Sequence, residues 1–332
     1  MQDELKGFWN YAIHPNKIIG YYETIKPRSR LKLNSSDFAN CEVDEDLKAN
    51  IDIAMSTRFD ITSVDNSHQG RISQNAARKI NRAIDYIVYI AKEKIIPRPF
   101  GKEESKFYLS FSTLTLPSAQ IHSDAEIMRE CFQPMLNTFR QKFGVKHYLW
   151  RVEKQGNGNV HYHILADKFI PWMELRNEWN KHVNALGYVD RYRSGRMQKL
   201  DRELFGGFSD SKKHYSSSDF VNPNSTDVHG LRCVSDLKAY FAKYMTKSGQ
   251  SSDVQGRLWG CSVTLSKLKG FVVQEAGELT EILNKLIDEY ECPCFSDKYY
   301  FVINVKVNLL RYVGGEAYYN GFEDYIYNTL LN

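Results

Sequence analysis

Two histidines separated by a single residue could together hold a metal ion. His161 and His163 lie in residues 159–165, where polar and apolar side chains alternate. This alternation predicts a half-buried β-strand, in which residues i and i+2 point to the same face. Both imidazoles should therefore converge on one face of a sheet, and neutral imidazoles are common ligands of divalent metals.

A carboxylate is expected beside this pair. Residues 147–153 predict a preceding strand, and Gln-Gly-Asn-Gly-Asn at 155–159 predicts a turn. The resulting hairpin would fold Glu153 back beside His161. Two ring nitrogens and one carboxylate suit Mg²⁺ or Mn²⁺ and leave positions open for a substrate phosphate. Packing alone also explains many His-x-His strands, so the metal interpretation depends on what lies downstream.

About eighty residues further on, the sequence predicts a helix over 236–247, with Ser235 as its cap. At about 100° per residue, one face of this helix, roughly 100° wide, carries Tyr240, Lys243, Tyr244 and Lys247. Each phenol would have an ammonium group nearby. A solvated amphipathic helix is the alternative interpretation of the same pattern.

Together these groups suit phosphoryl transfer from DNA to a tyrosine hydroxyl. A phenol with a pKa of about 10 is a poor nucleophile at neutral pH unless it is activated. A metal polarises the scissile phosphate, and a nearby lysine favours the phenolate or neutralises the leaving oxygen. The product is a 5′-phosphotyrosyl link and a free 3′-hydroxyl. The candidate contacts to the DNA are Arg151, Lys154 and Arg257.

Composition narrows the class of protein. The chain has 332 residues, 42% hydrophobic and 25% charged, which is typical of one or two globular domains. Residues 101–270 contain 25 Lys and Arg against 17 Asp and Glu, which favours a polyanionic partner. The sequence contains no apolar run of membrane-spanning length, no signal-peptide profile and no P-loop. We therefore expect a cytoplasmic protein with no membrane partner. The six scattered cysteines indicate reduced thiols.

The other elements follow from periodicity and cap signals. Residues 1–74 give no clear pattern, and 194–231 are loop-like. A capping box of Ser123 and Glu126 predicts the start of a helix that ends at Gly144. The remaining expected elements are helices at 74–94, 172–186 and 280–291, and strands at 106–117, 188–193 and 299–310.

Three short motifs resemble those of HUH endonucleases, specifically rolling-circle replication initiators. Residues 111–116, Phe-Ser-Thr-Leu-Thr-Leu, are similar to the first family motif, and His161-Tyr162-His163 matches the second. Residues 240–247 match the third motif in its two-tyrosine form, which resembles initiators of single-stranded DNA phages and plasmid Rep proteins. The segment 257–262 also resembles a downstream part of such proteins. The resemblance covers residues 105–270.

The resemblance implies an α+β fold, the HUH palm. In it, a ferredoxin/RRM-like central antiparallel sheet has flanking helices and carries the histidines. The endonuclease domain would span 101–270, after an N-terminal accessory region at 1–100 and before a C-terminal α/β extension at 271–332. It also implies nicking and rejoining of single-stranded or extruded origin DNA in a bacterial host cell. A separate host helicase and polymerase would then be partners.

Other functions remain open at this point. A single-strand transposase or a relaxase of a mobile element would use the same residues. Relaxases usually carry the tyrosine before the histidine motif, whereas here it follows. A non-catalytic DNA-binding regulator is the alternative of another class. A covalent protein–DNA adduct would separate an enzyme from a binding module.

Overall fold

A five-stranded antiparallel sheet forms the centre of the predicted endonuclease region. The computed structural model describes residues 7–24, 72–92, 94–96, 105–205, 222–231, 253–274 and 277–331. The strand order of the central sheet is β8-β5-β7-β6-β9. Its strands are β5 (Leu109–Thr115), β6 (Tyr148–Lys154), β7 (Val160–Ala166), β8 (Thr226–Leu231) and β9 (Trp259–Cys261).

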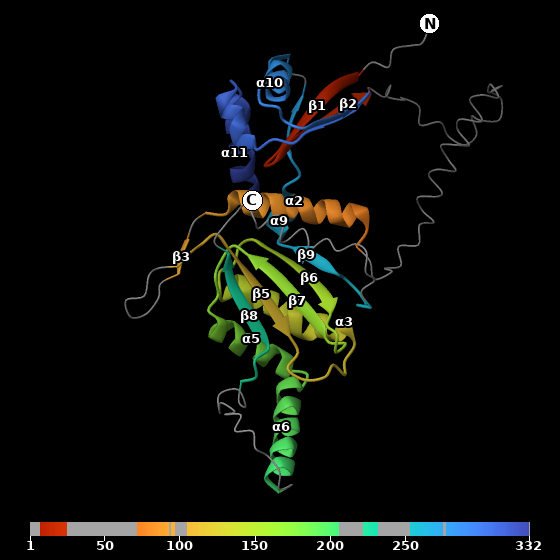
Figure 1. Cartoon of the computed structure of the whole chain (residues 1–332), viewed down its shortest axis with the longest axis vertical. Coiled ribbons are helices and arrows are strands. Elements are labelled where there is room, and N and C mark those ends of the chain that lie inside the picture. Colours follow the sequence, from red (N-terminus) through yellow and green to blue (C-terminus); the bar gives the residue numbers. More distant parts are fainter. Residues whose placement is uncertain are drawn as a thin grey trace, which may run out of the picture.

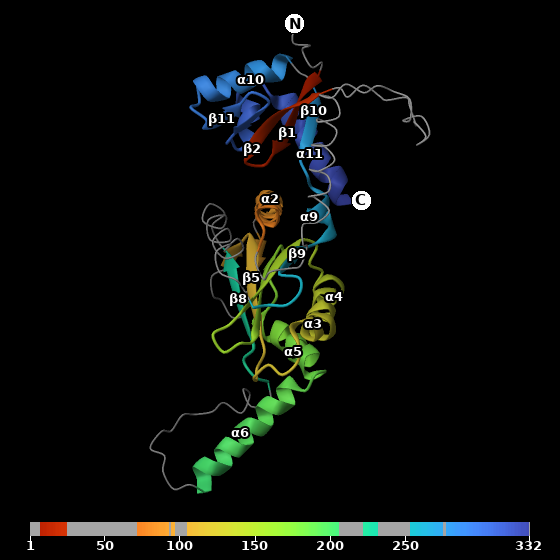
Figure 2. The same ribbon diagram turned by 90° about the vertical axis from the view of Figure 1, so that its right-hand side faces the viewer.

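Helices cover one face of this sheet (Figures 1 and 2). They are α3 (Asp124–Ile127), the π-helix η2 (Met128–Phe132), α4 (Gln133–Gln141) and α5 (Trp172–Asn184). Phe132 stacks on Tyr162 with ring centroids 3.9 Å apart and meets Trp150 edge-on at 5.0 Å. Because side chains alternate along a strand, burial of Tyr162 on this face sends both neighbouring histidines to the other face. The expected α+β fold, an antiparallel sheet with flanking helices consistent with an HUH palm, is confirmed.

Several local predictions are confirmed as well. The Ser123 side chain accepts the Glu126 backbone N–H, and the Glu126 carboxylate accepts the Ser123 backbone N–H, so the capping box is present. The β6–β7 turn is closed by a hydrogen bond from the Gly158 N–H to the Gln155 carbonyl, at 2.9 Å. Gly158 has φ +82°, a conformation that favours glycine.

The strand predicted at 188–193 is wrong, because these residues begin helix α6 (Tyr188–Phe205). The Asn184 side-chain oxygen accepts the backbone N–H groups of Val189 and Asp190 at 3.1 and 3.0 Å. It thereby satisfies two of the N–H groups that an α-helix leaves unpaired at its start. The loop predicted at 194–231 is also wrong in part, since α6 extends to Phe205 and β8 begins at Thr226.

The two ends of the chain meet in a second sheet of order β10-β1-β2-β12-β11. The N-terminal hairpin of β1 (Gly7–His14) and β2 (Lys17–Thr24) pairs with β10 (Phe271–Gln274) on one side and with β12 (Tyr300–Ile303) on the other. The edge strand is β11 (Cys294–Asp297). The strand predicted at 299–310 is therefore shorter than expected, and the 3₁₀ helix η3 (Val307–Tyr312) follows it.

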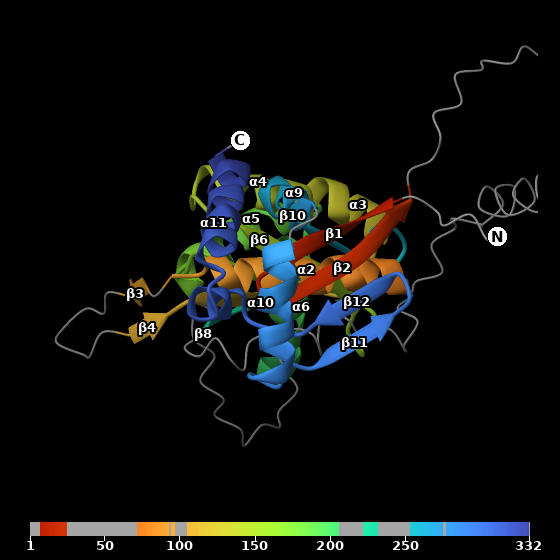
Figure 3. The ribbon, with the colours of Figure 1, turned by 90° about the horizontal axis from the view of Figure 1, so that it is seen from above.

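Helix α2 (Gln74–Ile90) lies between the two sheets, as Figures 2 and 3 show. His14 of β1 contacts the hydroxyl of Tyr86 at 3.4 Å, and Asn16 donates to Asp85 at 3.1 Å. Two more helices, α10 (Gly277–Asp288) and α11 (Glu316–Leu331), accompany the second sheet. A short hairpin joins β3 (Lys94–Ile96) to β4 (Ser105–Phe107), and α9 (Val263–Lys267) links β9 to β10. In the part of the chain that the structure describes, no helix meets the length and hydropathy needed to cross a bilayer.

Replacing Phe132 with alanine should destabilise the sheet that carries the histidines. This ring is fully buried between η2 and the strands, so its loss should lower the free energy of unfolding by about 3–5 kcal/mol. Urea denaturation measures the change. Phe295→Ala is the control, because that side chain is 66% exposed and should cost about 0.5 kcal/mol or less. A cost below about 1 kcal/mol for Phe132→Ala would show that this ring does not support β7.

Candidate metal centre

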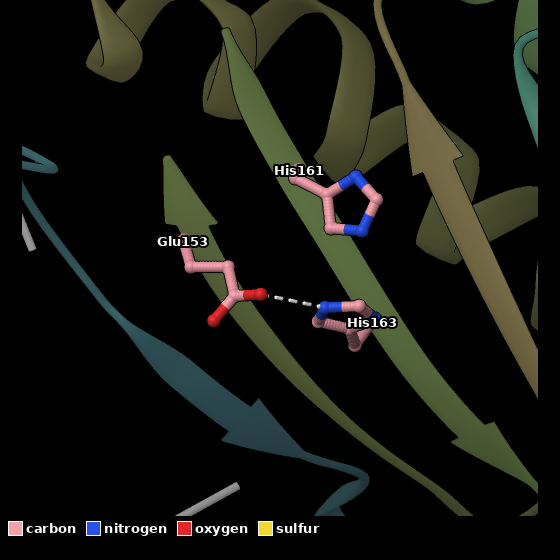
Figure 4. A group of neighbouring side chains, drawn as sticks. All are labelled: Glu153, His161 and His163. Carbon is pink, nitrogen blue, oxygen red and sulfur yellow. Dashed lines mark hydrogen bonds and ion pairs between the residues drawn. The ribbon is translucent and has the colours of Figure 1, made fainter. Parts of the chain in front are cut away.

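Three side chains that could bind a metal ion meet on the face of the sheet opposite α3–α5. The β6–β7 register pairs Glu153 with His161, and Arg151 with His163. One ligand atom from each of Glu153, His161 and His163 lies within 4.8 Å of the others. The His163 Nε2 donates to Glu153 Oε1 at 2.9 Å, as drawn in Figure 4, and the two imidazole centroids are 4.4 Å apart. The structure thus forms the triad as a potential metal-binding group.

The protonation states of this triad suit a cation. Burial, followed by the neighbouring His163, lowers the pKa of His161 to about 4, while Glu153 opposes the shift. The hydrogen bond from His163 lowers the pKa of Glu153, against the effect of its burial. At neutral pH His161 is therefore an uncharged imidazole and Glu153 a carboxylate, the forms in which these side chains bind metals.

A buried nitrogen atom gives a second sign that a ligand fits here. The Nδ1 atom of His161 is buried and has no hydrogen-bond partner among the described residues. A buried polar atom without a partner costs roughly 1–3 kcal/mol. Coordination or a reoriented ring would remove this cost. The donor set of two imidazoles and one carboxylate therefore fits a divalent cation such as Mg²⁺ or Mn²⁺.

The neighbouring strand β5 fixes the orientation of His163. The hydroxyl of Thr113 lies 3.4 Å from the Nδ1 of His163, and the ring of Phe111 stacks on the imidazole at 5.3 Å with an interplanar angle of 14°. A hydroxyl can donate or accept, so Thr113 can pair with either tautomer of His163. These contacts direct the Nε2 atom toward Glu153, in the way that outer partners orient metal-binding histidines. Two residues of the 111–116 motif thus have a structural role at the triad.

The three basic residues predicted to contact DNA lie in different surroundings. Arg151 is next to the triad on the same face and is 5% exposed. Lys154 forms an ion pair with Asp124 at 2.6 Å on the face that the helices cover. Arg257 is exposed, donates from Nε to the carbonyl of Trp259 at 2.8 Å, and lies 5.6 Å from the ring of Trp150. Of the three, Arg257 is the most accessible to a polyanion.

The predicted nucleophiles cannot be placed relative to the triad. Tyr240, Lys243, Tyr244 and Lys247 lie outside the residues that the structure describes. Their assignment depends on the sequence pattern and on the comparisons given below.

Two residues on this face were not found from the sequence. Strand β8 places Asp227 opposite Thr113, which in turn pairs with His163. Asp227 and His229 form an exposed ion pair at 2.7 Å. The sequence analysis treated this segment as loop because aspartate and glycine are uncommon in strands. The alternation of Asp227 and His229 with the less exposed Val228 was the available signal.

Comparison with known proteins gave one family match. Residues 109–249 match the model of a family described as replication-associated protein, of the ORF2 type. The matched region contains β5 to β8, the Glu153/His161/His163 triad, and the segment with Tyr240 and Tyr244. No curated protein and no solved structure matched the chain. The match supports a Rep-type, replication-associated protein, and it is compatible with an initiator that binds origin DNA.

Proposed function

We propose that this chain is an HUH-type replication initiator, which nicks single-stranded or extruded origin DNA and later rejoins the ends. The observation that carries the proposal is the convergence of Glu153, His161 and His163 on the face opposite the helices. This triad lies inside the region that matches the replication-associated family. The motif order of the two-tyrosine initiators supports the same function.

Held by the triad, a Mg²⁺ or Mn²⁺ ion would polarise the scissile phosphate and offset the charge that develops there. The phenolate of Tyr240 or Tyr244 attacks the phosphorus atom. The new bond joins the tyrosine oxygen to phosphorus, and the bond from phosphorus to the 3′-oxygen breaks. Lys243 and Lys247 favour loss of the phenol proton and neutralise the leaving oxygen, which takes up a proton to become the 3′-hydroxyl.

The two tyrosines allow a complete replication cycle. One tyrosine holds the 5′ end while the other cleaves the regenerated origin after a round of synthesis. Each transfer exchanges one phosphoester for another, so the ends can be rejoined without ATP. The free 3′-hydroxyl primes synthesis by a host polymerase, with strand separation by a separate host helicase in the bacterial cytoplasm. The endonuclease domain is assigned to 101–270, with 1–100 and 271–332 as accessory regions.

The alternatives fit fewer of the observations. A transposase or relaxase would share the chemistry, but the matched family is described by replication. A non-catalytic DNA-binding regulator would not need a carboxylate and two imidazoles converging on the face opposite the helices.

The test uses the full-length protein with single-stranded oligonucleotides tiled over the DNA that carries its gene. Each oligonucleotide is labelled at its 5′ or its 3′ end and incubated with Mn²⁺, and the products are separated under denaturing conditions. An initiator should attach covalently to the 3′-labelled fragment, since the protein becomes linked to its 5′ end. It should release the 5′-labelled fragment free, and EDTA should prevent both products. A shift that disappears in denaturant for every oligonucleotide would instead identify a binding module.

A further inference from the structure

An open polar pocket lies beside the edge strand β8, away from the metal triad. Its volume is about 310 Å³, and it forms between α5, the start of α6 and the segment that leads into β8. Its polar lining consists of Asn177, Asn180, Lys181, Asn184, Arg193 and Asn222.

Hydrogen bonds connect this pocket to the end of the sheet that carries the triad. Asn180 accepts the Ser225 hydroxyl at 2.6 Å, and the Ser225 carbonyl accepts the backbone N–H of Thr115 at 2.8 Å. Thr115 is paired with His161 in the sheet. Figure 1 shows α6 leaving from the end at which β5 terminates. A strand of DNA bound at the triad can therefore reach the pocket within a few nucleotides.

The acceptor atoms of the pocket amides are already used. Asn177 Oδ1 accepts from Asn222 Nδ2 at 2.6 Å, and Asn222 Oδ1 accepts from Asn180 Nδ2 at 2.5 Å. The oxygen of Asn184 accepts two backbone N–H groups of α6. An amide side chain offers two N–H donors and one oxygen. The groups left to meet a ligand are therefore donors, above all the Asn177 amide nitrogen.

Two cations add positive charge to this donor-lined pocket. Lys181 is exposed, and within the described ranges its ammonium makes no ion pair. Arg193 lines the pocket and keeps a long contact to Asp190 at 3.2 Å. Donors and cations together select an anion rich in acceptor atoms, and a nucleotide phosphate is such a group.

An aromatic platform stands further along the same helix. Trp172, at the start of α5, is 50% exposed and has the guanidinium of Arg176 4.5 Å from its ring. Arg176 also donates to Asn224, in the segment that borders the pocket, at 2.5 Å. Exposed aromatic rings beside a cationic groove are the usual means of binding single-stranded nucleic acid, because every base can stack on them.

We propose that this pocket binds one nucleotide of single-stranded DNA, next to the nucleotides held at the triad. Lys181 and Arg193 contact the phosphate, and the amide of Asn177 donates to the base. Thymine and guanine present carbonyl acceptors, whereas adenine and cytosine present amino donors that would face the donors of the pocket. The pocket therefore favours thymine or guanine. This inference rests on the proposed function only in taking the origin strand as the natural ligand.

The test measures equilibrium binding of fluorescein-labelled (dT)15 and (dA)15 to the full-length protein in EDTA, by fluorescence anisotropy at several salt concentrations. Lys181→Ala should weaken (dT)15 binding about fivefold and reduce the salt slope of log K by about 0.7, the value for one phosphate contact on a single strand. Asn177→Ala should leave the slope unchanged and reduce the preference for (dT)15 over (dA)15 by about threefold.

Lys146→Ala is the matched control, since this exposed lysine precedes β6 at the opposite end of the sheet. It should leave both the affinity and the slope unchanged. A wild-type slope in Lys181→Ala, or an equal change in Lys146→Ala, would overturn the proposal. If the covalent adduct forms but Lys181→Ala binds like wild type, the pocket inference alone fails. If no adduct forms yet Lys181→Ala shows the expected change, the pocket stands and the initiator function fails.

Discussion

The double substitution Tyr240→Phe, Tyr244→Phe should abolish the covalent protein–DNA product. Phenylalanine keeps the ring but removes the oxygen that attacks the phosphorus, so no substitute bond can form. Reversible DNA binding should stay within about twofold of wild type, because the lysines and arginines that neutralise the phosphates are unchanged. The measurement is the denaturing-gel assay with 3′-labelled origin DNA.

The matched control removes two phenols elsewhere. Tyr312 and Tyr327 are 75% and 65% exposed and lie in η3 and α11, so Tyr312→Phe, Tyr327→Phe should form the adduct normally. The single variants at 240 and 244 should each retain one nucleophile and support a single cleavage. An adduct that persists in the Tyr240/Tyr244 double variant would rule out both residues as nucleophiles.

The parts of the fold that were predicted from sequence depend on local signals. The β6–β7 hairpin follows from two alternating segments and a glycine-rich turn, and the turn length fixes which residues are paired. For this reason the juxtaposition of Glu153 and His161 could be expected before any coordinates were known. The capping box at Ser123 is likewise contained within four residues.

The parts that were missed depend on distant partners or on single side chains. Strands β1 and β2 form a sheet with strands from the other end of the chain, and no local pattern contains that pairing. Strand β8 includes Asp227 and Gly230, and pairing with β5 outweighs their low strand propensity. At Tyr188, the amide of Asn184 caps a helix where the apolar alternation alone favoured a strand. The orientation of His163 by Thr113 also requires β5 and β7 to be neighbours.

The metal triad yields the second large effect. The double substitution His161→Ala, His163→Ala should reduce Mn²⁺-dependent cleavage by about a thousandfold, the scale expected when electrostatic stabilisation of a transition state is lost. It should also remove Mn²⁺ binding, measured by titration calorimetry on the protein without DNA. Removing the rings should cost little stability, since the neutral imidazole of His161 lies buried with a nitrogen that no described residue pairs. DNA binding in EDTA should persist, because the tyrosines and the basic residues are unchanged.

His229→Ala provides the comparison that separates metal binding from a general effect of losing histidine. This residue lies on β8, two strands away from β7, and pairs with Asp227 instead of Glu153. Because it is exposed and outside the triad, its loss should leave Mn²⁺ affinity and cleavage near the wild-type values. Unchanged Mn²⁺ affinity in the His161/His163 variant would disprove the metal centre, even if cleavage were lost. An equal loss in His229→Ala would instead place the ion nearer to β8, with Asp227 as its carboxylate ligand.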